Sequence, residues 1–177
     1  MTKLKNLFSS LLGGAVALSA CGNGSQEPVG TSAAYARMLR VLYRNTVPTV
    51  APAALAWELR QGQAPLLLDV RTPTEYRVSH LAGARFVNFD SLQTEQFAGV
   101  DRRRSVVVYC SVGYRSERLG ERLQVLGFRQ VRNLYGGLFE WVNQGYDVYN
   151  AQGRTANVHP YSAVWSPWLQ KGQKVYE

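Results

Sequence analysis

The chain contains 177 residues, of which 46% are hydrophobic and 18% are charged, and its formal net charge is +8. This length suits one domain with a hydrophobic core of its own and a short tether. The two cysteines, Cys21 and Cys110, are too few for a metal site made of several thiolates, and no cofactor motif stands out.

Residues 1–20 have the layout of an export signal. Lys3 and Lys5 form a basic start, and an apolar run with small residues at its end extends from Leu7 to Ala20. The run is too short for an ordinary membrane-spanning helix, which needs about 20 apolar residues. We therefore predict a cleaved signal peptide over residues 1–20.

The end of this signal resembles the bacterial lipobox, through the sequence Leu18-Ser19-Ala20-Cys21. In a lipobox the cysteine becomes the lipidated first residue, so the resemblance implies a lipoprotein held on a membrane by acyl chains on Cys21. Gly22 follows, whereas an inner-membrane retention signal has aspartate there. We therefore expect the bacterial cell envelope, at the outer membrane and facing the periplasm. A plain secretory signal that ends near a cysteine is the alternative.

If the protein is exported, its compartment restricts both the molecules that it can bind and the chemistry open to its cysteines. The basic excess, which includes the run Arg102-Arg103-Arg104, favours small anions or lipid headgroups, whereas nucleic-acid binding would conflict with export. With Cys21 acylated, Cys110 would have no partner for an intramolecular disulfide. A lone thiol in an exported protein is a hazard unless it is buried or used.

The chain divides into four predicted segments. They are the signal peptide (1–20), the lipidated cysteine with a flexible tether (21–33), a domain with an N-terminal helical extension (34–150) and an aromatic tail (151–177). The tail is dense in aromatic side chains, so we expect it to pack on the domain surface. The alternative is a strip that docks an envelope protein partner.

Helices and strands alternate along the predicted domain. In chain order we predict a helix over 33–44, an edge strand near 47–50, a helix over 52–61, a strand over 66–70, a short helix capped by Thr72 or Thr74, a strand over 84–89, a helix from Asp90 to about Phe97, a strand over 105–109, a helix over 115–126, a strand over 131–134 and a helix that follows Gly136-Gly137 and ends near Gly145. This alternation predicts an α/β domain with a parallel sheet and helices on both faces.

A cysteine lies between the strand over 105–109 and the helix that begins at Arg115. Ligands of parallel α/β sheets collect beyond the carboxyl ends of the strands, where the first amides of the next helix have no internal partners. A thiolate at Cys110 would be stabilised there, and the thiolate is the nucleophilic form. The small residues Ser111 and Gly113 would let loop amides turn inward, and Arg115 would add a positive charge at the rim.

Three ordered stretches extend this pattern. They are LLLDVRTPTEYRVSHLAGARFVNF (Leu66–Phe89), VVVYCSVGYRS (Val106–Ser116) and LGFRQVRNLYGGLFEWVNQGYDV (Leu126–Val148). Together they resemble the rhodanese-like family over about Pro52 to Val148, and the first stretch matches that family at Asp69, Arg71, Glu75, His80, Gly83 and Ala84. The resemblance implies a parallel five-stranded sheet flanked by helices.

The resemblance also implies a reaction. Cys110 matches the family nucleophile, which takes the outer sulfur of an anionic donor such as thiosulfate, becomes a persulfide and passes the sulfur to cyanide or a thiol. The substrate-binding loop then comprises Ser111, Val112, Gly113, Tyr114, Arg115 and Ser116. We expect Asp69 and Arg71 to support the site as a hydrogen-bonded pair, His80 to be structural, and Trp141 to belong to the core.

Other functions remain as alternatives. Related phosphatases and arsenate reductases have arginine six residues after the cysteine, where this chain has Ser116, so the loop favours sulfur transfer. Ser111 stands where thiosulfate-type members commonly have arginine. A binding module would use the fold and the tail to hold another envelope protein, with Cys110 incidental. A thiol-redox helper would need a second cysteine to resolve a disulfide.

Overall fold

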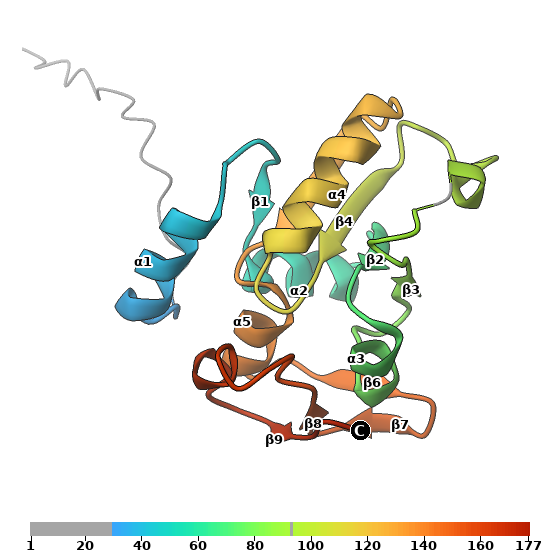
Figure 1. The fold of residues 1–177 in the computed structure, drawn as a ribbon. Coiled ribbons are helices and arrows are strands. Elements are labelled where there is room, and N and C mark those ends of the chain that lie inside the picture. The colour runs from blue at the N-terminus through green and yellow to red at the C-terminus, as the bar shows by residue number, and fades with distance from the viewer. Residues whose placement is uncertain (1–29, 93) are drawn as a thin grey trace, which may run out of the picture.

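The computed structural model describes residues 30–177 except residue 93, and it contains a five-stranded parallel sheet (Figure 1). The strands are β1 (Thr49–Val50), β2 (Leu66–Asp69), β3 (Arg85–Phe86), β4 (Ser105–Tyr109) and β5 (Gln130–Leu134). They lie in the order β1-β5-β4-β2-β3, and every neighbouring pair is parallel. The predicted fold class is confirmed, including the edge strand before the second helix.

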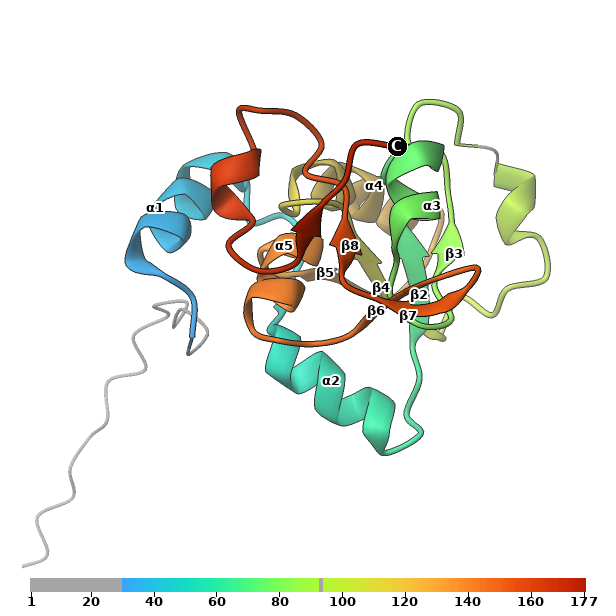
Figure 2. The same cartoon turned by 90° about the horizontal axis from the view of Figure 1, so that it is seen from below.

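Helices cover both faces of the sheet (Figures 1 and 2). They are α1 (Ala33–Leu42), α2 (Pro52–Arg60), α3 (Pro73–Val78), α4 (Tyr114–Val125), α5 (Gly137–Asn143) and the 3₁₀ turns η1 (Thr94–Phe97) and η2 (Ser166–Trp168). The side chains of β4 alternate between the two faces. Val107 and Tyr109 join the core formed with α1, α2 and α5, whereas Val106, Val108 and Cys110 join the core formed with α4.

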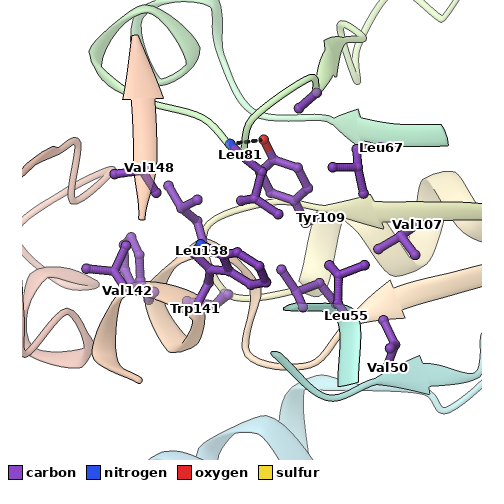
Figure 3. Packing of buried hydrophobic residues seen from close by; sticks show 14 of the residues in the cluster. Val50, Leu55, Leu67, Leu81, Val107, Tyr109, Leu138, Trp141, Val142 and Val148 are labelled. Carbon is purple, nitrogen blue, oxygen red and sulfur yellow. Dashed lines mark hydrogen bonds between the residues drawn. The ribbon is translucent and has the colours of Figure 1, made fainter. Parts of the chain in front are cut away.

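Buried apolar side chains pack together around the end of β4 (Figure 3). Leu55, Tyr109 and Leu138 are buried together there, and burying a side chain of this size contributes about 1.5–3 kcal/mol. The Tyr109 hydroxyl accepts a hydrogen bond from the Leu81 amide at 3.1 Å. The residue before Cys110 is therefore held by both packing and a hydrogen bond.

Most helix limits agree with the sequence prediction, and the start of α3 has a local cause. Thr72 caps this helix by accepting from the Glu75 amide, while the Glu75 side chain accepts from the Thr72 amide. This reciprocal pair is a capping box, which satisfies two amides that the helix itself leaves free.

After α3, the predicted strand is present but shorter than expected, and one predicted helix is wrong. The strand expected over 84–89 contains only Arg85 and Phe86, and no helix begins at Asp90. The Asp90 amide instead donates to the Asn88 side chain at 3.0 Å, a local turn that takes the chain away from the sheet. The segment up to Phe97 then ends in the short turn η1, whose Phe97 is fully buried.

The segment after α5 forms small paired strands. β6 (Val148–Asn150) and β7 (Gly153–Thr155) make an antiparallel hairpin, so the expected boundary between residues 150 and 151 falls in a turn. β8 (Asn157–Val158) and β9 (Gln173–Lys174) pair in parallel and enclose residues 159–172, which we call the C-terminal loop. In Figure 2 its turn η2 lies between α1 and α5.

The predicted signal peptide, Cys21 and the tether up to residue 29 lie outside the described residues. Within the part of the chain that the structure describes, no helix has the length and apolar character needed to cross a membrane.

Candidate active site

The loop between β4 and α4 places a sulfur atom at the start of a helix. Cys110 follows β4 directly, and Gly113 is the N-cap of α4 in a left-handed conformation with φ of 99°. The Gly113 amide donates to the Cys110 Sγ at 3.1 Å. The structure therefore aims a main-chain N–H group at the sulfur, as the strand–cysteine–helix pattern predicts.

The first two carbonyl groups of this loop are held by hydrogen bonds from the start of α5. Cys110 O accepts from the Leu138 amide at 2.8 Å, and Ser111 O accepts from the Phe139 amide at 3.0 Å. Both donors belong to the first turn of α5. Because the C=O and N–H of a trans peptide point in opposite directions, these bonds turn the following loop amides toward the sulfur side.

The next two carbonyl groups are bound by side chains. The Tyr43 hydroxyl donates to Val112 O at 2.8 Å and accepts from the Gly136 amide at 3.0 Å. The Asn133 side chain donates to Gly113 O at 2.9 Å. The four successive carbonyl groups from Cys110 to Gly113 thus each accept a hydrogen bond, which fixes the loop as a preformed cradle of amides for an anion.

Close contacts, with a side chain in one case and with the backbone in the other, make glycine necessary at two positions around the loop. A Cβ on Gly113 would overlap the Tyr43 hydroxyl and lie 2.7 Å from its Cζ. A Cβ on Gly137, whose φ is 60°, would overlap Cys110 O and lie 2.7 Å from the Ser111 carbonyl carbon. A real Cβ at either place would force the cradle apart.

A buried carboxylate neutralises the charge that the sequence predicts at the rim. Arg115 forms an ion pair with Glu75 at 3.1 Å, and the Ser111 hydroxyl donates to Glu75 Oε1 at 2.6 Å. Burial raises the pKa of Glu75, but attraction to Arg115 and Arg71 and these hydrogen bonds outweigh it, so the pKa lies below its usual value. Arg115 is thus present as predicted, but its charge is compensated.

A pocket of about 250 Å³ opens above the sulfur. Its floor and one side are Cys110, Ser111, Val112, Tyr114 and Arg115, so the structure brings most of the predicted loop residues together around it. Cys110 is only 1% exposed, and this pocket is its route to solvent. Tyr161 and Trp165 of the C-terminal loop form the opposite wall.

Ser116 has a different place from the one predicted. Its hydroxyl is fully buried and donates to Asn133 Oδ1 at 2.7 Å. Since Asn133 in turn holds the Gly113 carbonyl, Ser116 contacts the loop from behind. Its geometry is that of a positioning residue rather than a substrate ligand.

Asp69 and Arg71 form the expected hydrogen-bonded pair beneath the site. Both side chains are fully buried, with Arg71 Nη2 2.7 Å from Asp69 Oδ2. Arg71 also donates to the Ser79 carbonyl, and its guanidinium carbon lies 6.0 Å from the centre of the Tyr109 ring. The pair therefore joins the ends of β2 and α3 and contacts the residue before Cys110.

The arrangement of the titratable side chains bears on metal binding and on the role of His80. Among the described residues, no group of three or more His, Cys, Asp or Glu side chains is arranged to hold a metal ion. His80 stacks on Tyr76 with ring centres 4.0 Å apart, and its Nδ1 lies 2.9 Å from the Tyr76 carbonyl oxygen. Both contacts are with Tyr76 of α3 and hold the His80 ring against that helix, which fits a structural role for His80.

Sequence reasoning assigned no role in the site to several residues that form it. The Thr72-x-x-Glu75 spacing indicates a capping box, but nothing in it shows that the same carboxylate also binds the loop. Tyr43, Tyr161 and Trp165 are distant in sequence from Cys110 and carry no motif. Their roles arise from tertiary contacts alone.

Comparison with known proteins agrees with this geometry. The rhodanese-like domain family matches residues 52–144. A protein named probable adenylyltransferase/sulfurtransferase MoeZ from Mycobacterium tuberculosis is 31% identical over 97 residues, which cover 54% of this chain and 25% of that protein. Thiosulfate sulfurtransferase GlpE from Coxiella burnetii is 34% identical over 86 residues, covering 49% of this chain and 79% of GlpE.

A solved structure shows the same architecture. A rhodanese-related protein from Thermoplasma volcanium superposes with a TM-score of 0.51 and 27% identity, covering 57% of this chain and 96% of that one. Both MoeZ and GlpE are named as sulfurtransferases, and this chain spans only a quarter of the length of MoeZ. The family match, the parallel sheet and the cysteine loop together show that the chain belongs to the rhodanese-like family.

Proposed function

We propose that the protein is a rhodanese-type sulfurtransferase, which moves sulfane sulfur from a donor to a thiophilic acceptor through a persulfide on Cys110. The observation that carries the proposal is the Gly113 amide 3.1 Å from the Cys110 sulfur, in a loop whose carbonyl groups from Cys110 to Gly113 each accept a hydrogen bond. Amides fixed in this way stabilise an anion without reorganising during the reaction.

The first half of the reaction loads the enzyme. The Cys110 thiolate attacks the outer sulfur of the donor, and a new S–S bond forms as the S–S bond of the donor breaks. With thiosulfate, sulfite leaves with the electron pair, and the negative charge on the enzyme moves to the terminal sulfur of the persulfide. The loop amides then face that terminal sulfur.

The second half returns the enzyme to its starting state. An acceptor nucleophile, such as cyanide or a thiolate, attacks the terminal sulfur and forms a bond to it. The persulfide S–S bond breaks, and its electron pair returns to Cys110 as a thiolate. No net oxidation or reduction of the enzyme is needed.

The proposal is tested on the purified protein with thiosulfate and cyanide. We expect release of thiocyanate, and after exposure to donor alone we expect mass spectrometry to show one added sulfur atom on Cys110. Cys110→Ser, which replaces the thiol by a hydroxyl, should abolish both. A protein that binds donor but never carries the additional sulfur would contradict the proposal.

We further propose that the enzyme is anchored in the bacterial envelope through Cys21, at the outer membrane. The lipobox resemblance of Leu18–Cys21 and the basic, apolar start of the chain support this. Cells fed a labelled fatty acid should incorporate the label into the wild-type protein and not into Cys21→Ala. Label retained in that variant would contradict the lipid anchor.

A further inference from the structure

The wall of the active-site pocket opposite the catalytic loop comes from outside the family match. Tyr161 and Trp165 lie in the C-terminal loop, whereas the match ends at residue 144. Both side chains present aromatic surface to a pocket whose other lining includes Val112 and Tyr114. This chain therefore adds an apolar wall that the matched domain alone does not contain.

Contacts on both sides hold this wall in place. The Trp168 ring stacks on Tyr35 of α1 with centres 5.5 Å apart, and Leu169 is 1% exposed. The Asn143 side chain donates to the Trp168 carbonyl at 2.9 Å and accepts from the Gln170 amide at 2.8 Å. The pairing of β8 with β9 closes the base of the loop. The wall is therefore a built part of the fold.

Tyr161 is held in an uncommon backbone conformation. Its φ is 65°, and its amide donates to His159 Nδ1 at 3.0 Å. Residues other than glycine adopt such left-handed angles rarely, and they persist where surrounding contacts impose them, often at ligand sites. The conformation places the Tyr161 ring 4.7 Å from the Arg115 guanidinium carbon.

The charge in the pocket is small. Among the described residues that line it, Arg115 alone is a basic residue, and it is paired with the fully buried Glu75. Ser111 is neutral, and its hydroxyl is also directed to Glu75. Apart from the loop amides, a dianion such as thiosulfate would meet only one compensated guanidinium and aromatic side chains, which is a poor electrostatic match for its second charge.

We propose that this pocket selects organic sulfane-sulfur donors, which carry a single negative charge and an aryl or alkyl group that packs against Tyr161 and Trp165. The inference rests on the proposed sulfurtransferase function. With a thiosulfonate, R–SO₂–S⁻, the Cys110 thiolate bonds to the outer sulfur. The bond between the two donor sulfurs breaks, and R–SO₂⁻ leaves with the electron pair, so one thiolate and one monoanion give one persulfide and one sulfinate.

The apolar part of the proposal is tested with two monoanions that differ only in the organic group. Benzenethiosulfonate and methanethiosulfonate are compared by kcat/KM, with the full-length protein and cyanide as acceptor. The ratio of the two values is measured in the wild type, Tyr161→Gly and Trp165→Ala, so the intrinsic reactivity of each donor cancels between proteins. Glycine suits the left-handed backbone at residue 161.

We expect the preference for the aryl donor to fall about tenfold in each wall variant, because a lost apolar contact of this size has about that effect on specificity. Trp57→Ala is the matched control, since Trp57 is 52% exposed on α2 and does not line the pocket. This control should keep the wild-type ratio.

The charge part is tested with Glu75→Gln, which keeps the shape of the side chain and suits a capping box. Freeing the Arg115 charge should raise kcat/KM for thiosulfate relative to methanethiosulfonate, on the order of tenfold, because a dianion gains more from that charge than a monoanion. Partial unfolding would lower kcat/KM for both donors by the same factor, so it cannot raise the ratio of thiosulfate to methanethiosulfonate.

The outcomes separate this inference from the function on which it rests. If persulfide forms on Cys110 but both wall variants keep the wild-type ratio of aryl to methyl donor, the wall does not select donors and the inference is wrong. An unchanged thiosulfate ratio in Glu75→Gln would overturn the charge argument. If no donor of any class loads Cys110, the sulfurtransferase function itself fails and the inference fails with it.

Discussion

Gly113→Ala tests how rigidly the cradle around the sulfur is held. The new Cβ would overlap the Tyr43 hydroxyl and lie 2.7 Å from its Cζ and 3.0 Å from its Cε1. Tyr43 is 8% exposed and is tied to Val112 and Gly136 by hydrogen bonds, so its ring has no free direction in which to move. The substitution therefore adds steric overlap to the strain of alanine at a φ of 99°.

The two contributions can be separated in magnitude. Overpacking a filled site costs about 1–3 kcal/mol, and a left-handed backbone costs about 1–2 kcal/mol for a residue with a Cβ. We therefore expect Gly113→Ala to lower the free energy of unfolding by about 2–5 kcal/mol. Gly127→Ala is the control, because its φ is 90° and nothing lies within 4 Å of the new Cβ. It should lose only about 1–2 kcal/mol.

The assay is urea unfolding followed by tryptophan fluorescence, combined with persulfide formation on Cys110. In a Tyr43→Ala background the overlap is gone, so Gly113→Ala should then cost no more than the Gly127 control. The resulting coupling energy should be about 1–3 kcal/mol. An equal cost of Gly113→Ala in both backgrounds would refute the argument that Tyr43 and the loop are in rigid contact.

Three further predictions concern groups around the cradle. Tyr43→Phe leaves the Val112 carbonyl without its buried donor and should cost about 1–3 kcal/mol in urea unfolding, with slower persulfide formation; unchanged rates would show that the hydroxyl does not position the loop. For Glu75, the lowered pKa in the folded state means that ionisation stabilises the fold, so the stability advantage over Glu75→Gln should be complete above the usual pKa of a glutamate and lost as pH falls through the lower folded pKa; an advantage independent of pH would contradict the ion pair. Asp69→Asn leaves Arg71 buried without its counter-charge and should cost about 3–5 kcal/mol in thermal or urea unfolding, and a loss under about 1 kcal/mol would be incompatible with this geometry.

The sequence predicts the features that depend on local chemistry. The valine run before Cys110 indicates a buried strand, and the helix after it follows from apolar spacing, so the place of the thiol between strand and helix was predictable. Thr72 was one of two expected caps, and the structure shows its capping box with Glu75. The helix expected from Asp90 was wrong, because a short side-chain turn at Asn88 competes with helix formation there.

The rest of the site depends on contacts between distant segments. Tyr43 reaches Val112 across 69 residues, and nothing local distinguishes it from any other core tyrosine. Arg115 was predicted to add a positive charge at the rim of the loop, but its ion-pair partner Glu75 was not predicted, because Glu75 lies 40 residues earlier, on a different helix. Charge balance in a pocket is thus a tertiary property, which neither residue type nor spacing reveals.

The segment that matches the family, residues 52–144, is shorter than the segment that forms the complete site. The difference arises because the end of α1 and the C-terminal loop both contribute side chains to the site. A fragment cut at residues 52 and 144 would retain the nucleophile and the glycines around it. It would lose the Tyr43 hydroxyl, which binds the Val112 carbonyl. It would also lose the aromatic rings of Tyr161 and Trp165, which line the pocket. Any excised version meant for crystallisation, engineering or grafting should therefore extend from the first helix to the final paired strand.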